Sequence, residues 1–317
     1  MKRKLVIGAA QLGPISRNDT RRAVVVRLIE LMREAKSRGC DLVAFPELAL
    51  TTFFPRWYFE SQDEVDTWFE REMPGPETLA LFDEAKKLAI GFYLGYAELA
   101  VEADGVHHYN SSILVDKNAE IVGKYRKIHL PGHTENEPWR RFQHLEKRYF
   151  ERGNFGFPAF RTSIGKHEGV FGMALCNDRR WPETYRVLGL QDVEMTFIGY
   201  NTPVHYSQAP EHDHLQAFHN HLSMQAGAYQ NGMWVVGVAK AGEEEGSELL
   251  GQSCIVAPTG EIVAMCSTLG DELATVSCDL DRCREIRDNV FNFEQHREPD
   301  TYSLICETKG GADTLKT

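Results

Sequence analysis

The sequence predicts an α/β fold in which two β-sheets stack face to face and helices cover their outer faces. Short apolar runs typical of buried strands alternate along the chain with amphipathic segments of helical period. Residues 115–122 and 256–263 share one pattern, a strand followed by a turn and a second strand, as expected of equivalent hairpins in two sheets. The 317 residues are 42% hydrophobic and contain no Ser/Pro-rich linker, so we expect a single layered domain over residues 1–307.

The first half of the chain supplies strands and helices in alternation. Gly39 ends the first amphipathic segment, and Gly91 closes a second one that begins with proline. Residues 53–59 are predicted to form an aromatic loop. The predicted elements are a strand at 5–10, a helix at 20–38, a strand at 41–45, a helix at 76–89, and strands at 92–98, 109–115 and 121–125.

The second half begins with a long irregular segment that ends near Phe157. Its many aromatic and charged side chains favour an ordered, functional loop. Residues 308–317 are predicted to form a loose C-terminal tail. The other predicted elements are an apolar strand ending at Cys176, a helix beginning at Pro182, a strand at 195–200, a helix at about 213–229, strands at 234–239, 249–257, 262–266 and 273–278, and a short helix at 281–287.

Composition narrows the class of function. The net charge of −11 argues against nucleic acid or an anionic membrane as the main partner. No segment reaches transmembrane length, and the apolar run after the basic N-terminus is too short for a signal sequence. Seven cysteines without CxxC spacing fit a reducing compartment, so we expect a cytoplasmic protein without a disulfide framework.

Cys176 is the candidate nucleophile. It ends an apolar run and is followed at once by Asn177, Asp178, Arg179 and Arg180. A thiol that faces a helix N-terminus and guanidinium groups is expected to have its thiolate favoured by the local field, and Asn177 or Asp178 can cap the turn. The alternative is a buried structural cysteine. We prefer that alternative for Cys254, Cys266, Cys278 and Cys306.

Glu47 and Lys127 also stand where strands end, as Cys176 does. At a shared sheet edge, a carboxylate can take the thiol proton, the thiolate can attack a carbonyl or nitrile carbon, and a fixed cation can receive the oxyanion. Each signal is weak alone. Glu47 after Pro46 is also compatible with a loop cap, and Lys127 lies in a basic run that is compatible with a solvated face.

Three motifs together resemble those of the nitrilase superfamily of carbon-nitrogen hydrolases. They are residues 45–47 (FPE), 124–130 (KYRKIHL) and 176–183 (CNDRRWPE). Within the superfamily the chain is most similar to the N-carbamoyl-D-amino acid amidohydrolases, over residues 5 to about 302. The resemblance implies a four-layer α-β-β-α sandwich and a homodimer or homotetramer, with no cofactor and no metal.

The resemblance also implies roles for individual residues. Glu47 would be the general base, Lys127 the oxyanion stabiliser and Cys176 the nucleophile, with Glu146 orienting the lysine. Arg179 and Arg180 would clamp a substrate carboxylate, a task suited to planar guanidinium groups. The remaining implied contacts are the Asn177 backbone N–H at the oxyanion, Asn201 and Thr202 on the substrate, and His129 and His144 supporting the triad.

The implied reaction converts an N-carbamoyl-D-amino acid to the D-amino acid, carbon dioxide and ammonia through a carbamoyl thioester on Cys176. Within the superfamily, a β-ureidopropionase-like enzyme and a nitrilase or aliphatic amidase remain alternatives. A non-catalytic scaffold is a further one. Outside the superfamily, a metal-dependent amidohydrolase would need ligands among His205, His212, His214, His219 and His221, but we prefer the interpretation that these are spare histidines of a helix. The Glu243–Glu245 run is predicted to be variable surface.

Overall fold

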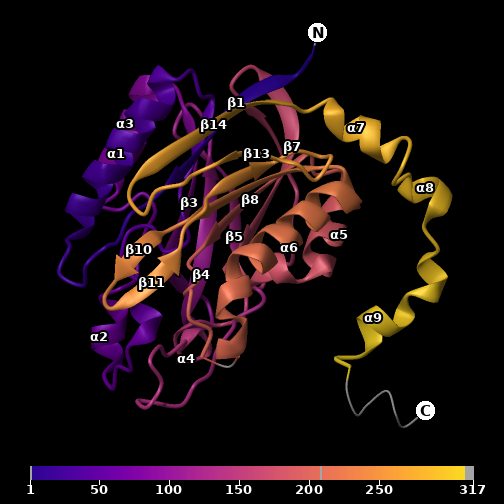
Figure 1. Ribbon diagram of the computed structural model, residues 1–317. Coiled ribbons are helices and arrows are strands. Elements are labelled where there is room, and N and C mark those ends of the chain that lie inside the picture. Colours follow the sequence, from indigo (N-terminus) through magenta and orange to yellow (C-terminus); the bar gives the residue numbers. More distant parts are fainter. Residues whose placement is uncertain (1, 208, 311–317) are drawn as a thin grey trace.

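The computed structural model describes residues 2–207 and 209–310, and it contains two six-stranded sheets (Figure 1). In the first sheet β1, β2 and β3 are parallel, and the other neighbours pair antiparallel. The strand order is β14 (Glu272–Asp279), β1 (Lys4–Gln11), β2 (Leu42–Ala44), β3 (Gly91–Glu102), β4 (Gly105–Val115) and β5 (Ile121–Arg126).

The second sheet repeats this plan, with β7, β8 and β9 parallel in the middle and antiparallel strands at the edges. The hairpins at residues 115–122 and 256–263 are equivalent, because Val115 pairs with Ile121 and Val256 with Ile262, each at a register shift. The strand order is β13 (Ile262–Met265), β12 (Cys254–Val256), β9 (Trp234–Ala239), β8 (Met195–Tyr200), β7 (His167–Leu175) and β6 (Phe160–Ile164).

Three apolar interfaces build the four predicted layers. Side chains such as Ile7, Tyr93 and Phe197 fill the space between the two sheets. Helices α1 (Arg21–Ser37) and α3 (Leu79–Leu88) pack on the outer face of the first sheet, and α5 (Pro182–Gly189) and α6 (Gln216–Asn231) pack on the second. Figure 1 shows the two helix pairs on opposite sides of the stacked sheets. The predicted α-β-β-α sandwich is confirmed.

Element boundaries differ from the predictions where backbone geometry intervenes. The predicted strand at 249–257 is two strands, β11 (Ser247–Leu250) and β12, because Gly251 and Gln252 have positive φ and turn the chain between them. The predicted helix at 76–89 begins only at Leu79. The predicted helix at 213–229 is a 3₁₀ turn, η3 (Pro210–Leu215), followed by α6.

Short elements escaped the sequence analysis because they have too few residues to show a period. The C-terminal ones run along the outside of the molecule (Figure 1). Of the predicted tail, residues 311–317 lie outside the described residues. Among the described residues, no helix has both the length and the apolar character that crossing a membrane requires. The elements that were missed are β6, β10 (Ala241–Glu244), η1 (Phe54–Arg56), α2 (Gln62–Asp66), α4 (Glu146–Tyr149), η2 (Cys176–Arg180), α8 (Phe293–His296), η4 (Pro299–Thr301) and α9 (Ser303–Glu307); the predicted short helix is α7 (Arg282–Arg287).

Candidate active site

Four reactive side chains from four separate segments meet between the sheets. Glu47 follows β2, Lys127 follows β5, Glu146 begins α4 and Cys176 follows β7. The Lys127 ammonium donates hydrogen bonds of 2.8 Å to Glu47 Oε1 and 2.6 Å to Glu146 Oε2. One oxygen of each carboxylate and Cys176 Sγ lie within 4.8 Å of one another. The structure therefore brings together the carboxylate, the ammonium and the thiol that the sequence placed at strand ends.

Two glycines make room for Glu47 at the seam between the sheets. A Cβ at Gly95 of β3 would lie 2.7 Å from the Cα of Glu47, and a Cβ at Gly199 of β8 would lie 2.8 Å from the carbonyl carbon of Pro46. Contacts this short are not tolerated between carbon atoms. The Pro46–Glu47 segment can therefore pass between the sheets only where both strands lack a side chain.

Two asparagines fix the Glu47 carboxylate. Asn110 Nδ2 donates to Oε1 at 2.8 Å, and the Asn201 backbone N–H donates to Oε2 at 3.1 Å. The Asn201 side-chain amide also donates to the Glu47 carbonyl oxygen at 2.9 Å. Asn110 is fully buried in β4 and was missed by the sequence analysis. Its signal was an amide inside an otherwise apolar strand, since buried polar groups need partners.

Glu146 and Lys127 are held from both sides. The Lys127 backbone N–H donates to the Asn110 carbonyl at 2.8 Å. A ring nitrogen of His144, Nε2, lies 2.9 Å from Glu146 Oε1, the oxygen that Lys127 leaves free. His144 therefore lies where the sequence analysis expected a supporting histidine, and its partner is Glu146.

Cys176 begins a tight turn that Asp178 organises. The backbone at Cys176 has φ +44°, a strained conformation for a residue with a side chain. The Asp178 carboxylate accepts hydrogen bonds from the Leu175 N–H at 2.9 Å and the Tyr125 hydroxyl at 2.7 Å. It also contacts His129, accepting from the backbone N–H at 3.0 Å and lying 2.8 Å from ring Nδ1. The sequence suggested Asp178 only as a possible cap, but its carboxylate accepts the hydrogen bonds that hold the turn of Cys176 in place.

His129 lies beside this turn and does not contact Glu47 or Lys127 through any hydrogen bond that the described residues form. Its ring stacks between Phe157 and Trp181, at centroid distances of 5.9 and 5.2 Å. The Asn177 side-chain amide donates to the His129 carbonyl at 3.1 Å. His129 therefore contacts the turn of the triad's cysteine through Asp178, and its supporting role stays a prediction.

The paired arginines have different surroundings. Arg179 is 1% exposed and donates to Asn220 Oδ1 at 2.8 Å, to the Cys176 carbonyl at 2.6 Å and to Thr202 Oγ1 at 2.6 Å. Because its guanidinium is occupied within the chain, Arg179 is less available than Arg180 for the predicted clamp on a substrate, which stays a prediction for both arginines. The Thr202 hydroxyl likewise serves as its partner.

Arg180 lies at a cavity that opens onto Cys176. Among the described residues Arg180 forms no ion pair, and its guanidinium lies 5.9 Å from the Tyr206 ring, which also lines the cavity. No carboxylate is among the lining residues. These are Pro131, His144, Cys176, Asn177, Arg180, Asn201, Thr202, Pro203, Tyr206 and Gln216.

Comparison with known proteins identifies the family. The pattern of the family described as Carbon-nitrogen hydrolase matches residues 6–288. The chain belongs to the carbon-nitrogen hydrolases. It is 30% identical to a nitrilase of Pyrococcus abyssi, over 85% of this chain and 89% of that protein. It is 28% identical to an N-carbamoylputrescine amidase of Solanum lycopersicum, over 99% and 98% of the two chains. A solved carbon-nitrogen hydrolase from Helicobacter pylori G27 shares the fold, with a TM-score of 0.81, 22% identity and coverage of 96% and 99%.

Burial sets the protonation states in this hydrolase. Desolvation raises the pKa of Glu47, and the neighbouring Glu146 raises it further against the pull of Lys127. Desolvation acts on Glu146 too, but Lys127 and His144 outweigh it and lower the pKa of Glu146 to about 2. The pKa values of the two carboxylates are thereby separated. Glu146 stays ionised beside Lys127, and Glu47 is the better proton acceptor.

The expected thiolate at Cys176 is not supported. Burial raises the pKa of the Cys176 thiol, and the Glu47 carboxylate adds to the effect, while Lys127 and Arg179 oppose it without prevailing. The local turn is a short 3₁₀ segment, so it offers only a weak helix dipole. The resting thiol therefore keeps its proton, and a base must remove it.

The histidines that suggested a metal-dependent amidohydrolase do not converge. His205 Nδ1 lies 2.8 Å from Asp213, and the His212 ring packs edge-on against His219. Within residues 2–207 and 209–310, none of the five lies in a group of three potential metal ligands. Glu47, Glu146 and Cys176 do form such a group, but the Lys127 ammonium bridges the two carboxylates.

Proposed function

We propose that the hydrolase cleaves N-carbamoyl-D-amino acids to the D-amino acid, carbon dioxide and ammonia. One observation carries the substrate class: of the described residues that line the cavity at Cys176, Arg180 supplies a guanidinium, and none supplies a carboxylate beyond the Glu47–Lys127–Glu146 cluster beside the thiol. A cationic cavity favours a substrate that bears a carboxylate beside its scissile group. The preference for the D-enantiomer rests on the resemblance of the motifs around Cys176 to those of the amidohydrolases of that class.

The charge of the cavity argues against the substrate named for one relative. N-carbamoylputrescine carries the same ureido group but ends in an amine that is cationic at neutral pH. That amine would meet the Arg180 guanidinium, and none of the described residues lining the cavity supplies a carboxylate to balance it. The shared ureido chemistry therefore supports the reaction, and the charge that Arg180 brings to the cavity favours an amino acid.

Carbamoyl transfer to the cysteine is the first half of the proposed reaction. Glu47 takes the proton of Cys176, and the sulfur attacks the ureido carbon while Lys127 and the Asn177 N–H stabilise the oxyanion. The bond to the terminal nitrogen breaks, and that nitrogen leaves as ammonia with the proton from Glu47. A carbamoyl thioester remains on the enzyme.

Water completes the cycle. Glu47 takes a proton from a water molecule, whose oxygen attacks the thioester carbon, and the sulfur leaves and recovers the proton. The released N-carboxy amino acid loses carbon dioxide to give the free amine. Asn201 Oδ1 is buried without a hydrogen-bond partner among the described residues, so it is available to accept a substrate N–H.

A substrate panel tests the proposal. We expect the highest kcat/KM on an N-carbamoyl-D-amino acid, compared with its L-enantiomer, N-carbamoyl-β-alanine, N-carbamoylputrescine, a nitrile and an aliphatic amide. A preference for N-carbamoyl-β-alanine would point to the β-ureidopropionase-like alternative. A preference for N-carbamoylputrescine would overturn the charge argument, and activity on the nitrile or amide alone would overturn the ureido chemistry.

A further inference from the structure

A buried ionic cluster lies outside the four reactive groups. It consists of Arg56, Lys240 and Glu244, whose exposed fractions are 6%, 0% and 1%. The prediction that the Glu243–Glu245 run is surface is therefore wrong for Glu244, because the end of β10 turns this side chain inward. The mechanism uses none of these three residues, although a buried ionic cluster is costly to maintain.

The Glu244 carboxylate accepts several hydrogen bonds from one segment of the chain, the residues that follow Thr51. Its Oε1 accepts hydrogen bonds from the Thr52 hydroxyl at 3.0 Å, the Phe53 N–H at 2.7 Å and Arg56 Nη2 at 2.7 Å. Its Oε2 accepts from Lys240 Nζ at 3.3 Å, and that ammonium also donates to the Thr51 carbonyl at 2.6 Å. The Glu244 carboxylate and its Lys240 partner thus fix residues 51–56, which follow Glu47 in the chain.

The fixed segment packs against the residues that hold Lys127. The Phe53 ring meets the His144 ring edge-on, with centroids 5.3 Å apart and planes at 89°. The Pro55 carbonyl accepts a hydrogen bond from the Leu145 N–H at 2.8 Å. His144 in turn contacts Glu146, which holds the Lys127 ammonium. A continuous path of contacts therefore leads from Glu244 to the group assigned to the oxyanion.

We propose that Glu244 is a positioning residue for this reaction: it holds Phe53 against His144 and thereby sets the orientation of Glu146 and Lys127. The role of Lys127 in this statement rests on the proposed function. Among the described residues, Glu244 does not line the cavity at Cys176, and its carboxylate forms hydrogen bonds with Ile15, Thr52, Phe53, Arg56 and Lys240 but with none of the reacting groups. Its effect should therefore appear in kcat and in the pH profile rather than in KM.

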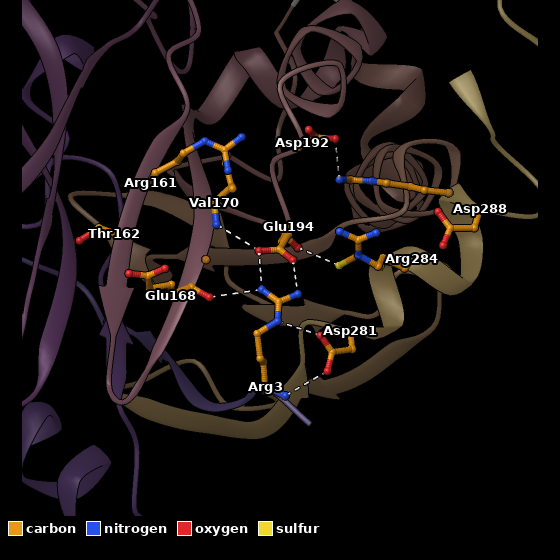
Figure 2. Close-up of a pocket in the computed structure, with 13 residues that line it drawn as sticks. Arg3, Arg161, Thr162, Glu168, Val170, Asp192, Glu194, Asp281, Arg284 and Asp288 are labelled. Carbon is orange, nitrogen blue, oxygen red and sulfur yellow. Dashed lines mark hydrogen bonds and ion pairs between the residues drawn. The ribbon is translucent and has the colours of Figure 1, made fainter. Parts of the chain in front are cut away.

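The central variant is Glu244→Gln, which keeps the shape of the side chain and removes its charge. Glu194→Gln is a matched control, because Glu194 is also buried, is 9% exposed, and accepts hydrogen bonds from Arg3 Nη2 at 2.6 Å and the Val170 N–H at 3.1 Å. Figure 2 shows Glu194 facing Arg3 in a pocket lined also by Arg161 and Arg284. That pocket shares no lining residue with the cavity at Cys176.

We expect Glu244→Gln to lower kcat by about 10- to 100-fold with KM within about two-fold, since misplacing a catalytic group costs rate rather than binding. The acid limb of the pH profile, which reports on Glu47, should move to higher pH, because a displaced Lys127 opposes the raised pKa of Glu47 less. Glu194→Gln should lower the melting temperature and leave kcat and the pH profile unchanged.

Two milder variants cover the case in which Glu244→Gln does not fold. Thr52→Val removes one hydrogen bond to the same carboxylate, and Phe53→Leu removes the ring edge on His144. Both should lower kcat in the same direction, by a smaller factor for Thr52→Val. Lower melting temperatures with unchanged kcat and pH profile in both would overturn the proposal.

The rate at which iodoacetamide alkylates Cys176, measured against pH, separates this proposal from the proposed function. This rate reports on the thiol and its base without any carbamoyl substrate. A profile shifted in Glu244→Gln but not in Glu194→Gln supports the positioning role even if the substrate panel fails. Identical profiles in both variants and the parent overturn it.

Discussion

At the scale of single residues, the site depends on two carboxylates that share one ammonium but differ in pKa. Lys127 contacts both Glu47 and Glu146, but His144 supports only Glu146. The result is one carboxylate with a lowered pKa and one with a raised pKa within a few ångströms. This asymmetry makes Glu47, rather than Glu146, the carboxylate suited to accept the thiol proton in the proposed mechanism.

Replacing the thiol should end turnover. We expect Cys176→Ser to lower kcat by more than about 10³-fold, because an alcohol is a far poorer nucleophile than a thiol with the same base. The hydroxyl fits the same buried space, so circular dichroism and the melting temperature should stay near those of the parent. Substantial activity in this variant would contradict a covalent cysteine mechanism.

The pH dependence should reflect the raised pKa of Glu47. The base must be ionised to accept the thiol proton, so kcat/KM falls as the pH drops through the pKa of Glu47. Because burial and Glu146 raise that pKa above its ordinary value of 4.5, the acid limb should lie at higher pH than for a free carboxyl group. A kcat/KM profile that stays flat down to pH 4.5 would exclude Glu47 as the base.

Arg180 and Arg179 should respond differently to truncation. Arg180→Ala removes a charge-assisted contact, so KM for N-carbamoyl amino acids should rise by roughly 10- to 100-fold, with little change for an uncharged amide. Arg179→Ala should instead lower the melting temperature, because it leaves Asn220 and Thr202 without their buried partner. Equal losses of Arg180→Ala on charged and uncharged substrates would remove the carboxylate assignment.

At the scale of secondary structure, the site depends on strands that end, or that carry a glycine, at matching positions in the two sheets. Glu47 and Cys176 follow parallel strands of different sheets, and the close approach of these strand ends is possible because β3 and β8 carry glycine opposite Pro46–Glu47. Open α/β sheets bind ligands at this edge. Here two such edges face each other.

Gly199→Ala should test this close approach. The new methyl group would overlap the Pro46–Glu47 backbone, so we expect a loss of about 1–3 kcal/mol in the free energy of unfolding and a lower kcat from displacement of Glu47. Gly270→Ala is the matched control, since its Cβ would meet nothing within 4 Å. Denaturant unfolding and kcat measured on both variants decide the question. Normal values for Gly199→Ala would show that the strands can separate freely.

At the scale of the whole molecule, Tyr93 ties the two sheets together near the site. Its hydroxyl, on β3, donates to the Ala174 carbonyl of β7 at 3.1 Å and accepts from the Gly199 N–H of β8 at 3.0 Å. Tyr93→Phe would leave both buried groups without this partner. We expect a loss of about 1–3 kcal/mol in the free energy of unfolding.

Tyr185→Phe provides the comparison, because the Tyr185 hydroxyl is buried with no hydrogen-bond partner among the described residues. Its removal should be neutral or stabilising in the same denaturant titration. If both variants lose the same stability, the cross-sheet hydrogen bonds of Tyr93 contribute nothing specific.

The layered fold was predictable because its signals are local. Strands such as β1 and β8 are continuous apolar runs, and the helices have a clear amphipathic period. The positions of Glu47, Lys127 and Cys176 at strand ends, together with their motifs, were enough to place them at one site. None of these inferences required knowing which side chains touch across the sheets.

The surroundings of the site were not predictable in the same way. Glu244 looks like surface in a run of three glutamates, and only the inward turn of β10 shows that its partners are Arg56 and Lys240. Arg179 and Arg180 are chemically identical neighbours, and one is buried while the other reaches the cavity. Such distinctions depend on contacts between residues far apart in the sequence.

The repeated plan of the two sheets divides the residues of the site between the two halves of the chain. The amino-terminal half contributes both acids and the amine, whereas the carboxyl-terminal half contributes the sulfur and the guanidinium at the pocket. Neither half alone holds all the groups that the proposed reaction uses. We therefore expect activity to depend on the contact between the two halves, and to be lost if they separated even with every strand intact.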